Sequence, residues 1–161
     1  MNVEIICIGS LKESYLREAA QEYIKRLTPY CKVKVTELRE TRLPQGAGEA
    51  EEESVRISEG EALLATAKKR EKAYAFALDA RGRQQASEKF ANTIQELALA
   101  GKSSLIFFIG GSLGLSEAVR QNADAVLSFS EMTFPHQLAR VLLLEQLYRA
   151  QKIQRGEPYH K

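Results

Sequence analysis

The sequence is poor in metal-binding and disulfide-forming residues, with two cysteines and two histidines among 161 residues. Cys7 and Cys31 do not stand at the short spacings of zinc or iron–sulfur ligands, so no metal is expected. Isolated thiols of this kind are typical of a reducing compartment, and we expect a cytoplasmic protein. The two histidines have no carboxylates at ligand spacing, which argues against metal-dependent hydrolysis.

Long apolar runs are absent as well. None approaches the roughly 20 residues that cross a bilayer, so no membrane partner is expected. Residues 1–5 have neither the basic leader nor the cleavage site of a signal peptide. Hydrophobic residues make up 44% and charged residues 27% of the chain, which is ordinary for a globular protein. We expect residues 1–161 to form a single domain.

The net charge of +2 is small, but charge is unevenly distributed along the chain. Between residues 49 and 61, six glutamates stand against Arg56 alone, whereas five lysines and arginines lie between residues 140 and 161. A basic end is typical of proteins that bind an anionic partner such as nucleic acid. A solvated helix end with a charged tail explains the same pattern, and charge alone does not separate the two.

Strand and helix patterns alternate, which predicts an α/β fold with a mainly parallel sheet and helices on its faces. Residues 41–48 contain one proline and two glycines and are expected to form a loop. Strands are predicted over residues 2–8, 33–38, 73–79, 105–109 and 125–129. Helices are predicted over residues 13–27, 50–69, 87–100, 116–122 and 135–152.

Several side chains predict where these elements end. Residues 80–83 follow the third strand and are expected to form a turn. Ser87 and Ser116 suit helix caps, because a serine hydroxyl can accept a free backbone N–H. Thr133 is the expected cap of the last helix, with Pro135 in its first turn.

The last predicted helix is apolar over well more than half of its circumference. A helix that packs only on its own sheet needs an apolar stripe of about 100°. The surplus predicts burial against a second copy of the chain, in a symmetric homodimer that packs helix on helix. A deep groove within one chain is the alternative. The residues concerned are Leu138, Val141, Leu142, Leu143, Leu144, Leu147 and Tyr148.

Two polar loops, residues 110–114 and 130–136, stand directly behind apolar strands. Loops that leave the carboxyl ends of neighbouring parallel strands meet in one crevice, where ligands bind. The glycines of the first loop expose backbone to a ligand, and the second loop carries aromatic and thioether side chains. Together they predict a site for a flat heteroaromatic ligand, although a tight structural turn also explains the glycines.

Familiar catalytic motifs do not fit these loops. The glycine loop lacks the Lys-Ser/Thr of a Walker A motif and the spacing of a dinucleotide fingerprint. The G-x-S-x-G elbow of serine hydrolases is missing. Asp79 stands at a strand end, where catalytic residues occur, but it is also a common turn residue. His136 suits packing or capping better than the role of a base.

The tail, residues 155–161, combines a tyrosine, a histidine and two cations. Tyr159 and His160 can stack on a base, and Arg155 and Lys161 can hold phosphates. A frayed and inert terminus is the ordinary alternative.

The two loops, the last helix and the tail together resemble one family, and the resemblance runs the whole length of the chain. It is the RlmH family of bacterial large-subunit ribosomal RNA pseudouridine N3-methyltransferases, a minimal group of the SPOUT class. The most specific matches are residues 127–137, the helix residues Arg140, Glu145, Gln146, Tyr148, Arg149 and Ala150, and the ending 155–161.

The resemblance implies a SPOUT-type fold whose C-terminal segment is threaded into a trefoil knot, and a homodimer. It implies S-adenosylmethionine as the cofactor, held by the two loops. The implied partner is 23S ribosomal RNA within the assembled ribosome. The cofactor-binding residues would be Leu78, Gly110, Gly111, Leu115, Phe129, Ser130, Glu131, Met132, Thr133 and Phe134.

The implied reaction methylates N3 of a pseudouridine, and the tail would serve the RNA side of the site. Tyr159, His160 and Arg155 would be catalytic, with His160 as the base because imidazole titrates near neutrality. The chemistry requires no metal. The RNA contacts would be Arg140, Arg149 and Lys161.

The residues leave other functions open. A non-catalytic RNA-binding or ribosome-assembly factor would use the tail and leave the crevice empty. A domain that binds a phosphorylated metabolite would need only the glycine loop. Within the enzyme class, a SPOUT methyltransferase with a different RNA target is the nearest alternative.

Overall fold

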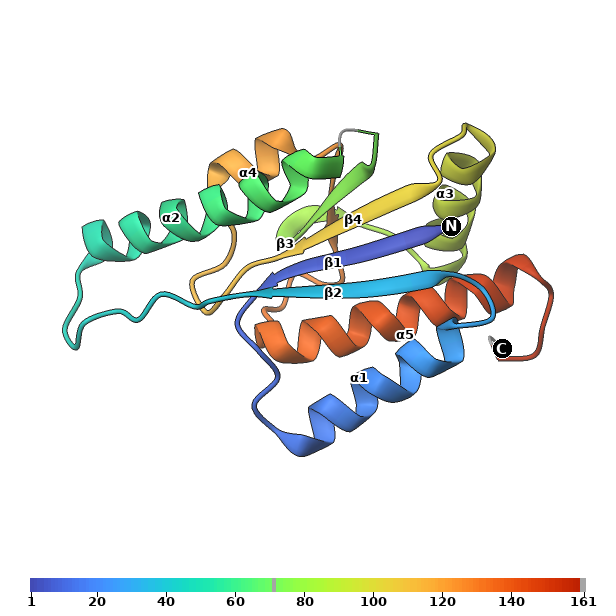
Figure 1. The fold of residues 1–161 in the computed structure, drawn as a ribbon, viewed down its shortest axis with the longest axis horizontal. Helices are drawn as coiled ribbons and strands as arrows, with labels where there is room; N and C mark the ends of the chain where they lie inside the picture. The colour runs from blue at the N-terminus through green and yellow to red at the C-terminus, as the bar shows by residue number, and fades with distance from the viewer. Residues whose placement is uncertain (71, 160–161) are drawn as a thin grey trace.

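The computed structural model describes residues 1–70 and 72–159 and shows one parallel sheet between two helical layers (Figure 1). The strand order is β2-β1-β4-β3-β5, and every neighbouring pair runs parallel, so the predicted α/β fold is confirmed. The strands are β1 (Asn2–Ile8), β2 (Lys32–Leu38), β3 (Tyr74–Gln84), β4 (Ser104–Ile109) and β5 (Ala125–Ser128). The helices are α1 (Ser14–Leu27), α2 (Glu49–Ala67), α3 (Ser87–Leu99), α4 (Glu117–Asn122) and α5 (His136–Gln154), with a 3₁₀ turn at Lys68–Arg70.

Side chains of β1 alternate between two apolar cores, because successive residues of a strand point to opposite faces of the sheet. Val3, Ile5 and Cys7 belong to a larger core with side chains of α1, α3 and α5. Ile6 and Ile8 belong to a smaller core with side chains of α2 and α4. Figure 1 shows α2 and α4 on one side of the sheet and α1 and α5 on the other.

Strand β3 is longer than the sequence predicts, and the turn expected at residues 80–83 is wrong. Leu78 and Arg83 both pair with Leu127 of β5, so the residues between them leave the ladder without ending the strand. Gly82 lies within this irregular stretch, and a Cβ there would stand 2.7 Å from the backbone of β5. Only glycine fits so close an approach. Residues 79–81 of this irregular stretch line the cavity at the carboxyl edge of the sheet.

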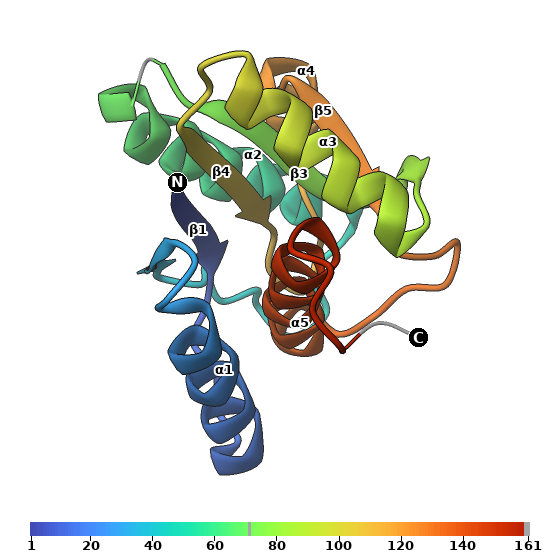
Figure 2. The same ribbon diagram turned by 90° about the vertical axis from the view of Figure 1, so that its right-hand side faces the viewer.

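Helix α5 lies between α1 and α3, as Figure 2 shows. Leu143 and Leu144 are fully buried there, and Leu147 is nearly so. A groove within the chain therefore accounts for most of the surplus apolar surface that pointed to a second copy. Leu138, near the start of the helix, stays 37% exposed.

The predicted helix caps are correct in one case of three. Ser116 caps α4, since its hydroxyl accepts the N–H of Val119. Ser87 is instead the first residue of α3, and its hydroxyl donates to Gln146 of α5 at 2.8 Å. Thr133 lies before the α5 boundary, and Pro135 takes the cap position without a side-chain bond, because proline offers no acceptor.

Within the described residues, no helix is long and apolar enough to span a bilayer. No three potential metal ligands come together in the same part of the chain. Cys7 and Cys31 are buried free thiols. Burial raises the pKa of the Cys7 thiol to about 11, so it is protonated at neutral pH.

Candidate functional site

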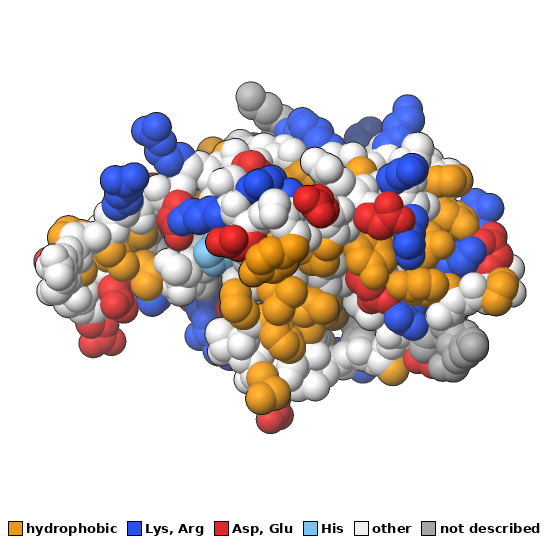
Figure 3. Space-filling view, turned by 90° about the horizontal axis from the view of Figure 1, so that it is seen from below, with side chains coloured by type: hydrophobic (Ala, Val, Ile, Leu, Met, Phe, Trp, Pro, Cys, Tyr) orange, Lys and Arg blue, Asp and Glu red, His pale blue; other side chains and the backbone are white. Residues whose placement is uncertain are grey.

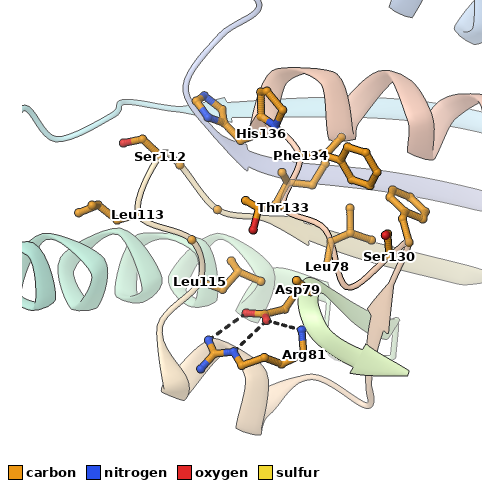
Figure 4. Close-up of a pocket in the computed structure, with 18 of the residues that line it drawn as sticks. Leu78, Asp79, Arg81, Ser112, Leu113, Leu115, Ser130, Thr133, Phe134 and His136 are labelled. Atoms are coloured by element: carbon orange, nitrogen blue, oxygen red, sulfur yellow. Dashed lines mark hydrogen bonds and ion pairs between the residues drawn. The ribbon is translucent and has the colours of Figure 1, made fainter. Parts of the chain in front are cut away.

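A cavity of about 680 Å³ opens at the carboxyl ends of β4, β3 and β5 (Figure 4). Its walls come mainly from residues 109–115, from residues 129–130 and 132–136, and from residues 78–81 of β3. The crevice predicted from neighbouring strand ends is therefore present. Its volume lies in the range typical of sites for small organic ligands.

The glycine loop turns back on itself directly after β4. Gly110 has no room for a side chain, since a Cβ there would lie 2.5 Å from the backbone carbonyl carbon of Gly114. Gly114 has a φ of +79°, which favours glycine, and its N–H donates to the carbonyl of Gly111 at 3.0 Å. The tight turn expected from the glycines is real, and it also leaves backbone along the cavity wall.

Helix α2 supports this loop from behind. The Nε of Arg56 donates to the carbonyl of Leu113 at 3.0 Å. At Gly60 the helix comes so close that a Cβ would stand 2.1 Å from the hydroxyl oxygen of Ser116. Sequence reasoning missed this support, because nothing local in a glutamate-rich helix marks the side that packs on a distant loop.

Glu59 of α2 is a buried acid beside the same loop, with 5% of its surface exposed. It accepts the backbone N–H of Thr41 at 2.9 Å, and a Cβ on Gly111 would lie 3.2 Å from its second oxygen. Burial raises the pKa of Glu59 above its ordinary value, although the Thr41 hydrogen bond acts in the opposite direction. Glu59 is therefore bonded to the loop after β2 and lies beside the glycine loop.

The second loop is tied by short-range hydrogen bonds. The hydroxyl of Ser128 donates to the carbonyl of Ser130 at 2.8 Å, and the Ser130 hydroxyl accepts the N–H of Met132 at 3.0 Å. The side chains of Met132 and Phe134 are 74% and 37% exposed. These two apolar groups are available to a ligand or to another protein surface.

The structure brings together all but one of the residues expected at a cofactor. Glu131 is exposed and is not among the residues that line the cavity. That the others bind a cofactor stays a prediction, but their convergence from three segments is a property of the fold. The lining residues from that set are Leu78, Gly110, Gly111, Leu115, Phe129, Ser130, Met132, Thr133 and Phe134.

Asp79 and Arg81 bring opposite charges to the cavity wall (Figure 4). Asp79 accepts the backbone N–H of Arg81 at 3.0 Å and its Nε at 3.1 Å, while Arg120 donates to the other carboxylate oxygen at 3.1 Å. Burial raises the pKa of Asp79, but the bonds from Arg81 and the charge of Arg120 outweigh it, and the pKa lies below its ordinary value. Asp79 thus makes a local bond to the backbone of Arg81 within β3, in place of the turn expected there, and it also faces the cavity.

His136, the first residue of α5, lines the cavity as well. Its Nε2 is buried and has no hydrogen-bond partner among the described residues, and a Cβ on Gly9 would lie 3.5 Å from it. Burial lowers the pKa of His136; Glu40 opposes the shift, and Arg140 and Lys12 add to it. The imidazole is therefore uncharged at neutral pH, which suits a packing role.

The described part of the tail folds back onto its own chain. The hydroxyl of Tyr159 donates to Glu145 at 3.1 Å, and its ring lies 4.8 Å from that of Tyr148. The guanidinium of Arg149, which also pairs with Glu145 at 2.6 Å, lies 4.8 Å from the centre of the Tyr159 ring. Burial and the neighbouring hydroxyl of Tyr23 raise the pKa of Tyr159, so it stays protonated.

Other contacts join the tail to the connection between α1 and β2. The guanidinium of Arg155 stands 4.6 Å from the centre of the Tyr30 ring. Glu157 accepts the hydroxyl of Tyr30 at 2.8 Å. The predicted catalytic His160 and the predicted RNA contact Lys161 lie outside the described residues.

The described part of the tail, residues 155–159, does not reach the cavity of its own chain. None of the described residues 155–159 lines it. Tyr159 packs beside Glu145, which lies about 14 Å along α5 from His136 at about 1.5 Å per residue. The resemblance assigns the tail and the cavity to one active site, but the described tail and the cavity are apart within a single chain.

Arg140 is not at a surface that RNA can reach. It is 2% exposed, pairs with Glu37 of β2 and donates to the carbonyl of Gly9 at 2.9 Å. The guanidinium thus ties α5 to the ends of β1 and β2. The structure does not support an RNA contact from Arg140 and gives this side chain a structural role.

Comparison with solved structures agrees with this architecture. A probable methylase family protein from Haemophilus influenzae Rd KW20 aligns with a TM-score of 0.57 and 14% identity, over 99% of this chain and 70% of its own. A probable methyltransferase from Bordetella pertussis Tohama I has the same TM-score and identity, over 92% and 95% of the two chains. Likeness at this level of identity shows the fold alone.

Sequence comparison is more specific. A relative named Ribosomal RNA large subunit methyltransferase H, from Clostridium novyi (strain NT), is 52% identical over 161 residues, the full length of both chains. A relative of the same name from Alkaliphilus oremlandii (strain OhILAs) is 49% identical over the same length. Residues 1–160 match the family described as "Predicted SPOUT methyltransferase". The chain therefore belongs to the SPOUT methyltransferase family, whose members use S-adenosylmethionine as methyl donor.

Proposed function

We propose that this protein methylates large-subunit ribosomal RNA and that the acceptor is N3 of a pseudouridine in 23S RNA. The RNA class rests on full-length relatives named Ribosomal RNA large subunit methyltransferase H, which share about half of their residues with this chain. The acceptor atom rests on the resemblance of the two loops and the tail to the RlmH family. We further propose that the substrate is the RNA in the assembled ribosome.

The cavity fits S-adenosylmethionine in size and in the character of its walls. The cofactor consists of a flat adenine, a ribose and a methionine chain, and a cavity of about 680 Å³ accommodates a ligand of that size. The glycine loop offers backbone groups to an adenine edge, while Leu78, Leu115 and Phe129 offer apolar surface to its faces. When bound, the cofactor supplies an electrophilic methyl group on a sulfonium.

The task of the protein at the acceptor is to align the base and to remove one proton. The N3 imide has a pKa of roughly 9–10, so deprotonation at pH 7 costs about 3–4 kcal/mol. A modest base, or a cation beside the imide anion, is sufficient for this. Alignment of two reactants can contribute about 7–11 kcal/mol, so positioning of the RNA is the larger contribution.

We assign the RNA side of the reaction to the tail. His160 is the proposed base, and Tyr159 would contact the pseudouridine. Arg155 and Lys161 would hold phosphates or the imide anion, because their cations are suited to both. Arg149, beside Tyr159, would support the tail from α5.

A homodimer would bring the tail of one copy to the cavity of the other. Tyr15 of α1 and Leu138 of α5 are 66% and 37% exposed, and Figure 3 shows apolar side chains gathered on this face of the molecule. In a twofold contact, the same surface meets itself. If the two α5 helices run antiparallel, the C-terminal end of each lies beside the N-terminal end of the other. The exposed remainder of α5, rather than the whole helix, supports this dimer.

We also propose that the C-terminal segment is knotted, as the family resemblance implies. One very close backbone approach between distant segments is consistent with a segment threaded through a tight loop. A Cβ on Gly82 of β3 would lie 2.7 Å from backbone atoms of Val126 and Leu127 in β5. Knots are otherwise rare in folds of this kind.

The single observation that carries the proposed function is the full-length identity of about one half to the relatives named above. The test is mass spectrometry of large-subunit RNA from cells that lack this protein. We expect one pseudouridine to lose its methyl group and to regain it when the purified protein and S-adenosylmethionine are added to ribosomes. An unchanged methylation pattern would contradict the proposal.

A further inference from the structure

The methionine end of S-adenosylmethionine is a zwitterion, whereas its adenosine end is uncharged. A cavity that holds the whole cofactor therefore needs partners for one ammonium and one carboxylate. Among the described residues that line the cavity, the side chains that are ionised at neutral pH are Asp79 and Arg81. The other titratable side chain there, His136, is uncharged because burial lowers its pKa.

The two residues differ in how firmly they are held. The carboxylate of Asp79 is 10% exposed and is anchored by Arg120, whose side chain is 12% exposed. Arg120 is itself fixed, because it donates to the carbonyl of Leu115 at 2.5 Å and to Glu117 at 2.6 Å. The side chain of Arg81 is 68% exposed and forms an ion pair with Asp79. The Asp79 carboxylate is thus held in place, whereas the exposed Arg81 side chain can change its conformation.

The backbone around this pair is also suited to a binding role. Residues 79–82 leave the β3–β5 ladder between the two pairings of Leu127. Residues 79–81 line the cavity and have no pairing partner in the β3–β5 ladder. Arg81 can therefore move without breaking the sheet.

We propose that Asp79 and Arg81 form the subsite for the methionine end of the cofactor. The α-ammonium would occupy the positions on Asp79 that Arg81 holds in this structure, and Arg81 would bind the α-carboxylate. One ion pair within the protein is exchanged for two with the ligand, so no charge is left unpaired in the cavity. The inference rests on S-adenosylmethionine as the cofactor.

A ribose contact is the competing role for Asp79, since a carboxylate can also accept two hydroxyls. Two ligands separate these roles. S-adenosylhomocysteine has both the ribose and the amino-acid end, whereas 5′-methylthioadenosine has the ribose and lacks the amino acid. If Asp79 binds the methionine end, its replacement weakens the binding of S-adenosylhomocysteine alone. If Asp79 binds the ribose, its replacement weakens the binding of both ligands.

The experiment is calorimetric titration of the full chain with each ligand. We expect the wild type to bind S-adenosylhomocysteine at least tenfold more tightly than 5′-methylthioadenosine, because charge-assisted hydrogen bonds are lost with the amino acid. Asp79→Asn and Arg81→Ala should each lower the affinity for S-adenosylhomocysteine about tenfold. The affinity of both variants for 5′-methylthioadenosine should stay within twofold of the wild-type value. Arg83→Ala is the matched control, because Arg83 is exposed and does not line the cavity. This variant should bind both ligands with wild-type affinity.

Three outcomes would overturn the inference. Equal affinity of the wild type for the two ligands would show that no such subsite exists. Parallel weakening of both ligands in Asp79→Asn would assign this carboxylate to the ribose. If the wild type binds neither ligand, the cavity is not the cofactor site. Since Asp79 also anchors Arg120, Asp79→Asn can affect folding, and Arg81→Ala keeps the test decisive because it leaves the Asp79–Arg120 pair in place.

Discussion

The two ends of α5 are built in different ways. At the N-terminal end, the cavity is shaped by backbone: glycines without room for a Cβ, a bulge in β3 and a loop supported by α2. At the C-terminal end, the tail is held by side chains, with Tyr159 beside Tyr148 and Arg155 over Tyr30. The first end is fixed by packing, and the second depends on surface contacts.

This difference bears on function, because the two ends would move at different cost. Cation–π contacts and exposed ion pairs each contribute about 1 kcal/mol or less. A tail held by a few of them can leave its place and enter a neighbouring site. The tightly packed backbone at Gly110 and Gly82, where a Cβ has no room, cannot yield in this way. The cavity is therefore preformed, whereas the tail is exchangeable.

The largest effect is expected from Gly110→Ala. A Cβ there would lie 2.5 Å from backbone, so the glycine loop must shift, at a cost of about 1–3 kcal/mol or more, and S-adenosylmethionine binding should be lost. Gly156→Ala is the matched change at the tail end. Gly156 has a φ of +63°, and a Cβ there would meet no other atom. The substitution should therefore lower the free energy of unfolding by about 1 kcal/mol and leave S-adenosylmethionine binding unchanged. Urea unfolding and calorimetric titration measure both, and similar results for the two variants would contradict the contrast.

The next largest effect is expected from deletion of residues 159–161. Methylation of large-subunit RNA should fall at least about a hundredfold, because the proposed base and base-contacting group are removed. Affinity for S-adenosylmethionine should stay within twofold, since the described tail does not line the cavity. Leu99→Ser, a change at an 83% exposed side chain on α3, is the control. Full activity of the truncated chain would show that the tail takes no part in the reaction.

A smaller effect is expected from Arg56→Gln, which removes the hydrogen bond from α2 to the carbonyl of Leu113. One such bond contributes about 1 kcal/mol, so the affinity for S-adenosylmethionine should fall about fivefold. Glu53→Gln is the matched control, because it removes the ion pair on Arg56 but keeps the bond to the loop. If both variants bind as the wild type does, α2 does not position the loop.

The smallest effect is expected from Glu59→Gln, and it should depend on pH. The pKa of Glu59 is raised in the folded protein, so ionisation of Glu59 lowers the stability of the fold at neutral pH. Below the pKa of the unfolded chain, Glu59 is protonated in both states and costs no stability. The glutamine still accepts the N–H of Thr41. Near pH 4 the variant and the wild type should have the same free energy of unfolding. As the pH rises towards 7, the variant should become more stable than the wild type. Thermal unfolding at several pH values measures this, and a constant difference would be the contrary result.

Much of the fold follows from local sequence. The apolar runs of β1 and β4, the serine at position 116 and the glycine loop each specify their own structure within a few residues. The placement of the two loops at one crevice then follows from parallel strands. For this reason local sequence predicts the two loops of the cavity, whereas the individual lining residues such as Leu78 and Leu115 come from the family resemblance.

Features that depend on distant contacts were not accessible. The sequence around Arg81 and Gly82 is typical of a turn, yet pairing with β5 keeps these residues in a strand. Arg140 has the pattern of an exposed helix cation, but Glu37 and Gly9, far away in the chain, bury it. The role of Asp79 at the cavity depends on both the bulge and Arg120. Local patterns do not encode partners of this kind.

The central claim, a fixed cavity in one copy served by the tail of another, is tested most directly by mixing two inactive variants. Thr133→Arg places a long side chain in the cavity from an exposed loop position, and a second variant lacks residues 159–161. In coexpressed mixtures, half of the dimers carry one intact cavity and one intact tail across the twofold contact. The account predicts recovery of about a quarter of wild-type methylation. A mixture as inactive as each variant alone would contradict it.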